Sequence, residues 1–129
     1  MTRFAGSWQL VPELSHYDQG GPPEFGRYLI STDAGMHKFR VIWRKDGRDF
    51  DIAFAAASDG SVTPCDFPGV DGFRLRQEDD ALVSEALLEG QIVARALRRV
   101  SGDLMSVQQL NATPEGGWAR IFQVYRRSV

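Results

Sequence analysis

The sequence predicts an all-β protein, a single up-and-down antiparallel β-barrel of about eight to ten strands over residues 1–129. Three observations predict it. The chain has 129 residues, of which 43% are hydrophobic, and this suits one domain with one core. Turn-forming pairs such as Asp46-Gly47 and Glu89-Gly90 recur mostly about every dozen residues, as in a meander with tight hairpins. The segments between them alternate apolar and polar residues with the period of a strand.

The chain begins with a short strand that carries Gly6-Ser7-Trp8. The glycine allows two segments to approach closely, and the indole can plug one end of a closed sheet. We expect Trp8 to be buried there, covered by Arg126 or Arg127 through a cation–π contact. Residues 12–26 follow and contain too many prolines and glycines for a regular element. We expect a long loop there, with at most one short helical turn.

The clearest hairpin lies in residues 37–54, with its turn at residues 45–48. One face of both strands is apolar and carries Phe39, Val41, Trp43, Phe50, Ile52 and Phe54. The other face is mainly charged, so we expect one dry face and one wet face. Together with Phe73 on a later strand, these inward aromatic residues either form an apolar cup for a ligand or pack the barrel shut.

Residues 80–100 are rich in Ala, Leu, Glu and Arg, which are strong helix formers. A helix broken near Gly90 is therefore one alternative. Gly90, however, falls where a hairpin turn belongs, and tertiary context often overrides helix propensity. We expect two antiparallel strands in this stretch.

The last strand, residues 119–127, holds the sharpest candidate for a binding residue. Alternation places Arg120 on one face with Phe122 and Val124, so an inward Phe122 implies an inward Arg120. A buried guanidinium must be paired, here either with a ligand carboxylate or with an interior acid such as Glu85. The alternative places Arg120 near the rim in a solvated ion pair.

The strand before it, residues 104–110, offers Gln108 as a second polar candidate. A glutamine inside a barrel indicates a wet cavity or an oriented ligand. Met105 and Val107 compete with Gln108 for the inward face, so an outward Gln108 is the alternative.

Several of these segments resemble lipocalins and fatty-acid-binding proteins. Gly6-x-Trp8 on a first strand, then a loop and Gly26-Arg27-Tyr28-Leu29-Ile30, is similar to short bacterial lipocalin-like proteins. Leu88-Glu89-Gly90-Gln91, a strand and Ser101-Gly102-Asp103-Leu104 resemble two turns of the fatty-acid-binding proteins. The resemblance implies a calycin-like barrel with adjacent first and last strands. It also implies that Arg120-x-Phe122 stands where that family often has an Arg-x-Tyr that grips the ligand carboxylate.

The chain departs from the fatty-acid-binding pattern in three ways. Phe122 lacks the tyrosine hydroxyl, and Leu97 stands where the family often has a second interior arginine. Residues 12–26 are too few for the two-helix lid of that family. The carboxylate grip is therefore at best half present, and the portal must be built differently.

Composition excludes several classes of function. The net charge of −2 supplies no field for nucleic acid or an acidic membrane. The longest apolar run, residues 52–57, is too short to span a bilayer. The start of the chain lacks the apolar stretch of a signal peptide, and the single Cys65 cannot form an internal disulfide, so we expect a cytoplasmic protein. Cys65, His16 and His37 do not have the spacing of metal ligands, and we expect neither a metal nor a cofactor.

These observations favour a non-enzymatic binding protein for a small hydrophobic or amphipathic ligand, lipid-like or fatty-acid-like, inside the barrel. The candidate ligand contacts are Phe39, Trp43, Phe54, Gln108, Arg120 and Phe122. One alternative is a cofactor-free enzyme at the barrel mouth that uses His16, Tyr17 or His37. Another is a packed barrel that serves as an oligomerisation module. For that module Ile42, or Met105 and Val107, would mark the outer face, and a homodimer is left open. The volume and lining of the interior distinguish these functions.

Overall fold

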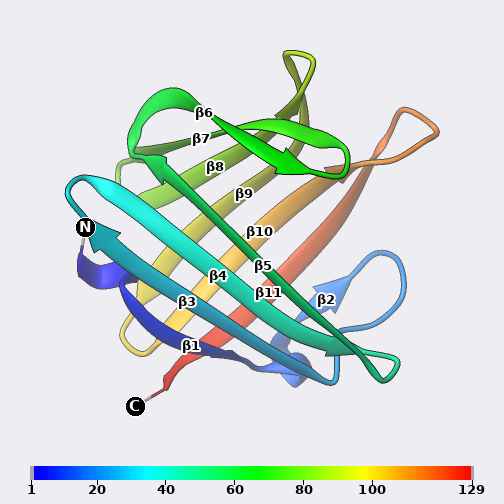
Figure 1. Cartoon of the computed structure of the whole chain (residues 1–129). Coiled ribbons are helices and arrows are strands. Elements are labelled where there is room, and N and C mark those ends of the chain that lie inside the picture. The colour runs from blue at the N-terminus through cyan, green and yellow to red at the C-terminus, as the bar shows by residue number, and fades with distance from the viewer. Residues whose placement is uncertain (1, 129) are drawn as a thin grey trace.

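Eleven strands and two short 3-10 helices make up residues 2–128, which is the part of the chain that the computed structural model describes (Figure 1). In chain order they are η1 (Thr2–Phe4), β1 (Gly6–Leu10), η2 (Pro12–Leu14), β2 (His16–Tyr17), β3 (Phe25–Asp33), β4 (Met36–Lys45), β5 (Arg48–Ala57), β6 (Asp59–Phe67), β7 (Val70–Glu78), β8 (Ala81–Leu88), β9 (Gln91–Ser101), β10 (Leu104–Ala112) and β11 (Trp118–Ser128). All pairs are antiparallel, and the predicted all-β barrel is confirmed. No helix within this range is long and apolar enough to cross a membrane.

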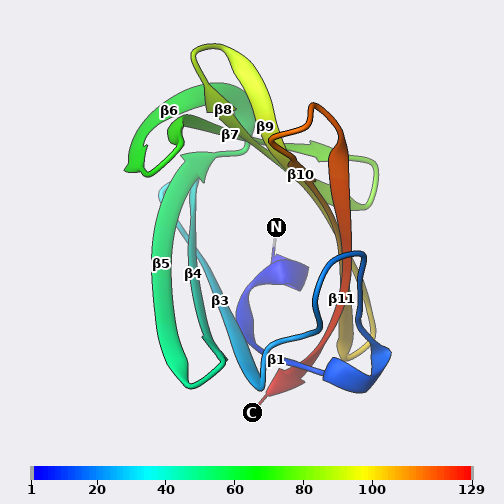
Figure 2. The ribbon, with the colours of Figure 1, turned by 90° about the vertical axis from the view of Figure 1, so that its right-hand side faces the viewer.

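The strands form one sheet that curls around a common interior (Figure 2). Their order is β5-β4-β3-β1-β11-β10-β9-β8-β7-β6, and the short β2 pairs with β11 outside this path. The first and last strands are therefore neighbours, as expected, with Trp8 opposite Arg127.

The barrel has a seam between β5 and β6, the two ends of the sheet order. No ladder joins these strands within residues 2–128, so the barrel is nearly closed and β5 and β6 are its edge strands. Inside the barrel, side chains pack past this seam: the rings of Phe54 on β5 and Phe73 on β7 lie 4.5 Å apart between centroids. The edge strand β6 is irregular and contains Pro64, which lacks an N–H and so discourages pairing with another chain.

Trp8 plugs one end of the barrel, as predicted. Its side chain is fully buried, and its Nε1 donates a hydrogen bond of 3.0 Å to the Phe4 carbonyl. The Arg127 guanidinium lies 4.2 Å from the indole centroid. Gly6 makes room for this contact, because a Cβ there would lie 3.0 Å from Arg127 Nη1.

The helix-rich composition of residues 80–100 does not produce a helix. β8 and β9 form the predicted hairpin, and its turn residues Glu89 and Gly90 have φ values of 51° and 79°. Ala81–Glu85 are buried on both faces of β8, inside the barrel and beneath side chains outside it. The burial of side chains on both faces stabilises a strand here, and this stabilisation outweighs the local preference for helix.

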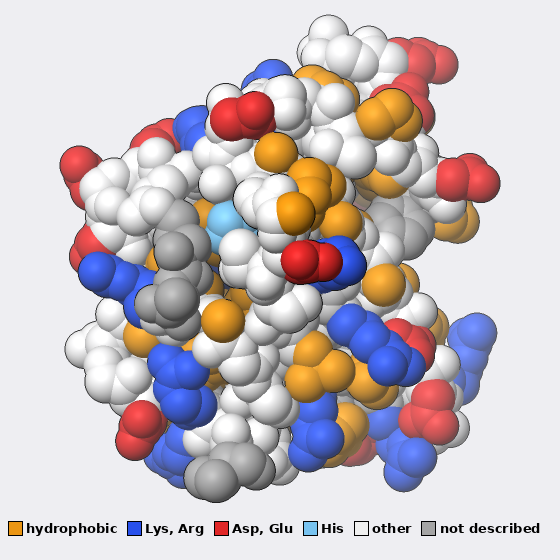
Figure 3. Space-filling view, turned by 60° about the vertical axis from the view of Figure 1, so that its left-hand side comes forward, with side chains coloured by type: hydrophobic (Ala, Val, Ile, Leu, Met, Phe, Trp, Pro, Cys, Tyr) orange, Lys and Arg blue, Asp and Glu red, His pale blue; other side chains and the backbone are white. Residues whose placement is uncertain are grey.

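The hairpin β4–β5 has the predicted dry and wet faces. Outside, Arg40 pairs with Asp51 at 2.6 Å and Arg44 with Asp49 at 2.7 Å. In the view of Figure 3, acidic and basic side chains are interspersed over the surface, in keeping with the small net charge.

Candidate ligand-binding cavity

The barrel encloses a cavity of about 520 Å³ that is lined mainly by apolar side chains. One wall comes from β4, β5 and β7 and consists of Val41, Trp43, Ile52, Phe54, Val70 and Phe73. Across from it, β8 and β9 contribute the small residues Ala86, Ala94 and Ala96, which leave space that larger side chains would fill. The interior is therefore open rather than packed shut.

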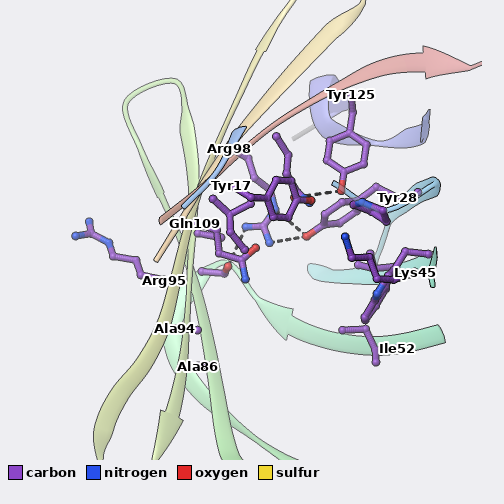
Figure 4. A pocket seen from close by; sticks show the side chains of 18 of the residues that line it. Tyr17, Tyr28, Lys45, Ile52, Ala86, Ala94, Arg95, Arg98, Gln109 and Tyr125 are labelled. Carbon is purple, nitrogen blue, oxygen red and sulfur yellow. Dashed lines mark hydrogen bonds between the residues drawn. The ribbon is translucent and has the colours of Figure 1, made fainter. Parts of the chain in front are cut away.

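A buried arginine lies in this cavity (Figure 4). The Arg98 side chain on β9 is 2% exposed. Its Nε and Nη2 donate to the Tyr28 hydroxyl at 3.0 and 2.6 Å, and its Nη1 donates to Ser84 Oγ at 2.9 Å. Its guanidinium also lies 5.0 Å from the Phe39 ring centroid. Within residues 2–128, no ion pair includes Arg98.

A chain of neutral polar groups extends from β11 to β2. Gln123 Nε2 donates to the Tyr17 hydroxyl at 2.5 Å, and the Tyr125 hydroxyl donates to Gln123 Oε1 at 3.2 Å. Burial raises the pKa of Tyr125 far above its usual range. Burial also raises the pKa of Tyr17, although the Gln123 hydrogen bond opposes this shift. Both tyrosines therefore remain neutral hydrogen-bonding groups at physiological pH.

The loop between β2 and β3 covers the cavity mouth, where Gln19, Gly20, Gly21 and Pro23 line the space. Lys45 Nζ donates to the Gly21 carbonyl at 2.7 Å and the Pro22 carbonyl at 3.4 Å, which ties the loop to the end of β4. This short strap takes the place of a helical lid.

Three solved structures share this architecture across nearly the whole chain. A Schistosoma mansoni fatty acid binding protein in complex with arachidonic acid matches with a TM-score of 0.68 and 12% identity, covering 100% of this chain and 98% of that one. A zebrafish ileal bile acid-binding protein complexed with cholic acid has a TM-score of 0.61 and 10% identity, covering 98% and 99%. An abundant heat-soluble (SAHS) protein of Ramazzottius varieornatus has a TM-score of 0.71 and 10% identity, covering 98% and 96%.

The chain has a calycin-like fold. No protein-family model matches the sequence, and no curated protein matches it. These likenesses concern the architecture, because the sequence identities are low.

In this calycin-like barrel, the predicted aromatic residues point inward. Trp43 and Phe54 line the cavity. Phe39 is 2% exposed and belongs to the core beside it, stacked on Phe54 with centroids 4.9 Å apart. The aromatic face thus lines the cavity in one region and packs in the core in another, and it does not pack the barrel shut.

Three predicted site residues lie outside. Arg120, Phe122 and Gln108 are exposed, and the inward orientation expected for Arg120 and Phe122 is wrong. Alternation explains the correction, because the cavity-lining residues on β11 are Ile121, Gln123 and Tyr125. On β10, Met105 and Val107 are fully buried and take the inward positions, which places Gln108 in solvent.

Glu85 is not an interior partner for an arginine. It is buried on the outer side of β8, where its Oε1 accepts from Arg74 Nε at 2.7 Å and Arg76 Nη1 at 3.0 Å. Asp18 binds the backbone of Arg120, with its Oδ2 accepting from the Arg120 N–H at 3.0 Å.

Sequence reasoning missed Arg98, because the spacing of the turn motifs pointed to Leu97. The small residues Ala94 and Ala96 alternate with Arg95 and Leu97, and this pattern could have revealed that Arg98 faces inward. Arg95 also belongs to the residues that line the cavity, but its side chain extends away from the other labelled side chains in Figure 4.

The residues that the sequence suggested for an enzyme or for an oligomerisation module do not form a common site. The His16 side chain is 79% exposed, and His37 is buried in the barrel wall without lining the cavity, so only Tyr17 lines it. Met105 and Val107 are buried and therefore cannot mark an outer interface.

Proposed function

We propose that this protein binds one small amphipathic molecule inside the barrel and that Arg98 anchors the anionic head of that molecule. The observation that carries the proposal is a buried guanidinium whose partners are two neutral hydroxyls, from Tyr28 and Ser84. Hydroxyls satisfy part of its hydrogen-bonding capacity but leave its charge uncompensated. A carboxylate from a ligand would supply both the negative charge and strong acceptors.

The shape of the cavity supports the rest of the proposal. A volume of about 520 Å³ lies within the range of small-molecule sites, which are mostly apolar with a few convergent polar groups. Trp43 and Phe54, predicted as ligand contacts, would pack against the hydrocarbon body. The complexes of the two similar barrels with arachidonic acid and cholic acid are consistent with this class of ligand.

The test is a titration of stearate and of the matching fatty alcohol against the parent protein and the Arg98→Met variant. A hydrogen bond to a charged group contributes about 1.5–3 kcal/mol, so we expect stearate to bind roughly ten- to a hundred-fold more weakly to Arg98→Met. The alcohol should lose much less. Arg98→Met should fold, because it removes an uncompensated buried charge and retains an apolar stem.

Arg120→Met is the matched comparison, since it makes the same substitution on the outer face. We expect it to bind stearate as the parent does. Equal losses of acid and alcohol in Arg98→Met, or a loss confined to Arg120→Met, would contradict the anchor. Failure of the parent protein to bind either ligand would contradict the proposed function.

A further inference from the structure

The polar side chains of the cavity are unevenly distributed. The β4, β5 and β7 wall is apolar up to Lys45 at the mouth. Beyond the Arg98 anchor, the opposite side is lined by Ile121 and by four neutral polar residues from β10, β11 and β2: Gln109, Gln123, Tyr125 and Tyr17. A ligand held only by its head and its hydrocarbon chain leaves these groups without a function.

The register gives the position of the two amides relative to the anchor. Arg98 pairs with Val107, and Val107 pairs with Gln123, so Arg98 and Gln123 lie in one row across three strands. Neighbouring strands are about 4.8 Å apart, which puts Gln123 roughly 10 Å from Arg98 along the backbone row. Gln109 lies one strand from Arg98 and one row nearer the mouth, at roughly 8 Å, since two residues of strand add about 7 Å.

Both amides retain unused hydrogen-bonding capacity. Gln123 uses one N–H on Tyr17 and accepts from Tyr125, and Gln109 uses one N–H on Asn111 at 3.0 Å. Within residues 2–128, the Gln109 carbonyl has no donor, and the Tyr17 hydroxyl accepts a hydrogen bond but has no acceptor for its own hydrogen. An alkyl chain against these groups would deprive them of water without replacing its hydrogen bonds.

A hydroxyl is the ligand group that fits this wall, because it both donates and accepts and carries no charge. A second carboxylate does not fit, since the amides and tyrosines supply no compensating positive charge. We propose, on the basis of the function proposed above, that the preferred ligand is a monocarboxylic amphipathic acid with a hydroxyl about 8–10 Å from its carboxylate. The side-chain amides of Gln109 and Gln123 would form hydrogen bonds with this hydroxyl.

The first measurement compares stearate with a set of mid-chain monohydroxystearate isomers on the parent protein, by calorimetric titration. We expect at least one isomer to bind about ten-fold more tightly than stearate, which corresponds to one to two well-made neutral hydrogen bonds. Stearate that binds as tightly as every isomer would overturn the inference and leave the anchor role of Arg98 intact. Binding of no acid at all would reject the proposed function itself, so the two failures are distinguishable.

The second measurement assigns the preference to the amides. Gln109→Leu and Gln123→Leu should each lower the affinity for the preferred hydroxystearate by roughly five- to ten-fold and leave stearate binding unchanged or stronger. Gln108→Leu is the matched control, because it makes the same change at the exposed neighbour of Gln109. Tyr17→Phe controls for the loss of the contact between Tyr17 and Gln123, and it should keep a hydroxyl preference through Gln109. A preference that persists in the Gln109→Leu, Gln123→Leu double variant would contradict the assignment.

Discussion

Two buried charged residues, Arg98 and Glu85, differ in whether oppositely charged side chains surround them. Inside the barrel, Arg98 has only hydroxyls as hydrogen-bond partners among residues 2–128, whereas Glu85 lies on the outer side within reach of Arg74, Arg76 and Arg95. A structural charge is compensated by its own chain, as Glu85 is. Arg98 has no such compensation among residues 2–128, and this contrast supports the binding role that we propose for it.

Glu85 should make stability depend on acid pH. Burial tends to raise its pKa, but the hydrogen bonds from Arg74 and Arg76 outweigh this, and its pKa lies below the usual value. Its stabilising effect is therefore present above its unfolded pKa of about 4.3 and lost as the pH falls through the lower folded value. We expect Glu85→Gln to lose about 1–3 kcal/mol of unfolding free energy at neutral pH, because it removes the negative charge that pairs with Arg74 and Arg76. Urea unfolding from pH 7 to pH 3 should show the two proteins converging in acid; a constant difference would contradict the assignment.

His37 should make the unfolding free energy depend on pH in a higher range than Glu85 does. Its side chain is 2% exposed, neither ring nitrogen has a hydrogen-bond partner among residues 2–128, and burial lowers its pKa. The unfolded chain binds a proton more readily, so stability should fall as the pH drops below about 6.5 and continue to fall until the folded pKa is passed. His37→Phe, which can keep the stacking on Phe39, should flatten the unfolding free energy between about pH 7 and 5. A slope between about pH 7 and 5 that persists in His37→Phe would contradict this assignment.

Among the elements, β1 and β11 do most to close one end of the barrel. They bring together Trp8, Phe4 and Arg127, which come from the two ends of the chain. The Arg127 guanidinium also donates to the Ala5 and Arg3 carbonyls at 2.9 and 3.0 Å. The plug is therefore built from segments at both ends of the chain and depends on the pairing of β1 with β11.

Trp8→Ala should remove a large part of this end. Phe and Trp to Ala changes in cores cost about 3–5 kcal/mol, which is a large share of the stability of a small domain. We expect thermal unfolding to shift down by well over ten degrees or the protein to fail to fold. Leu14→Ala, at a side chain that is 50% exposed, is the comparison and should melt close to the parent. A Trp8→Ala protein that melts within a degree or two of the parent would show that Trp8 does not support the core.

At the scale of the whole molecule, the barrel separates three tasks. The plug closes one end, the strap of residues 18–24 covers the mouth, and the alanines of β8 and β9 keep the space between them open. No backbone ladder joins β5 to β6 among residues 2–128, and beside this seam Phe54 of β5 packs on Phe73 of β7. The cavity thus results from strand number and side-chain size together, and no single segment of the chain contains it.

The sequence by itself determined the all-β architecture, the hairpins, the Trp8 plug and the inward aromatic face of residues 39–54. These features follow from neighbouring residues: turn chemistry sets the hairpins, and a strand with one apolar face has only one favourable orientation. Only the tertiary structure decided which face of β11 points inward. Its two faces, Arg120 with Phe122 and Ile121 with Gln123 and Tyr125, both mix polar and apolar residues. A shift of one residue exchanges such faces at little cost in hydrophobic burial, so pairing with β10 and β1 settled the orientation and turned Arg120 outward. The pairing of β9 with β8 and β10 placed Arg98 in the cavity instead.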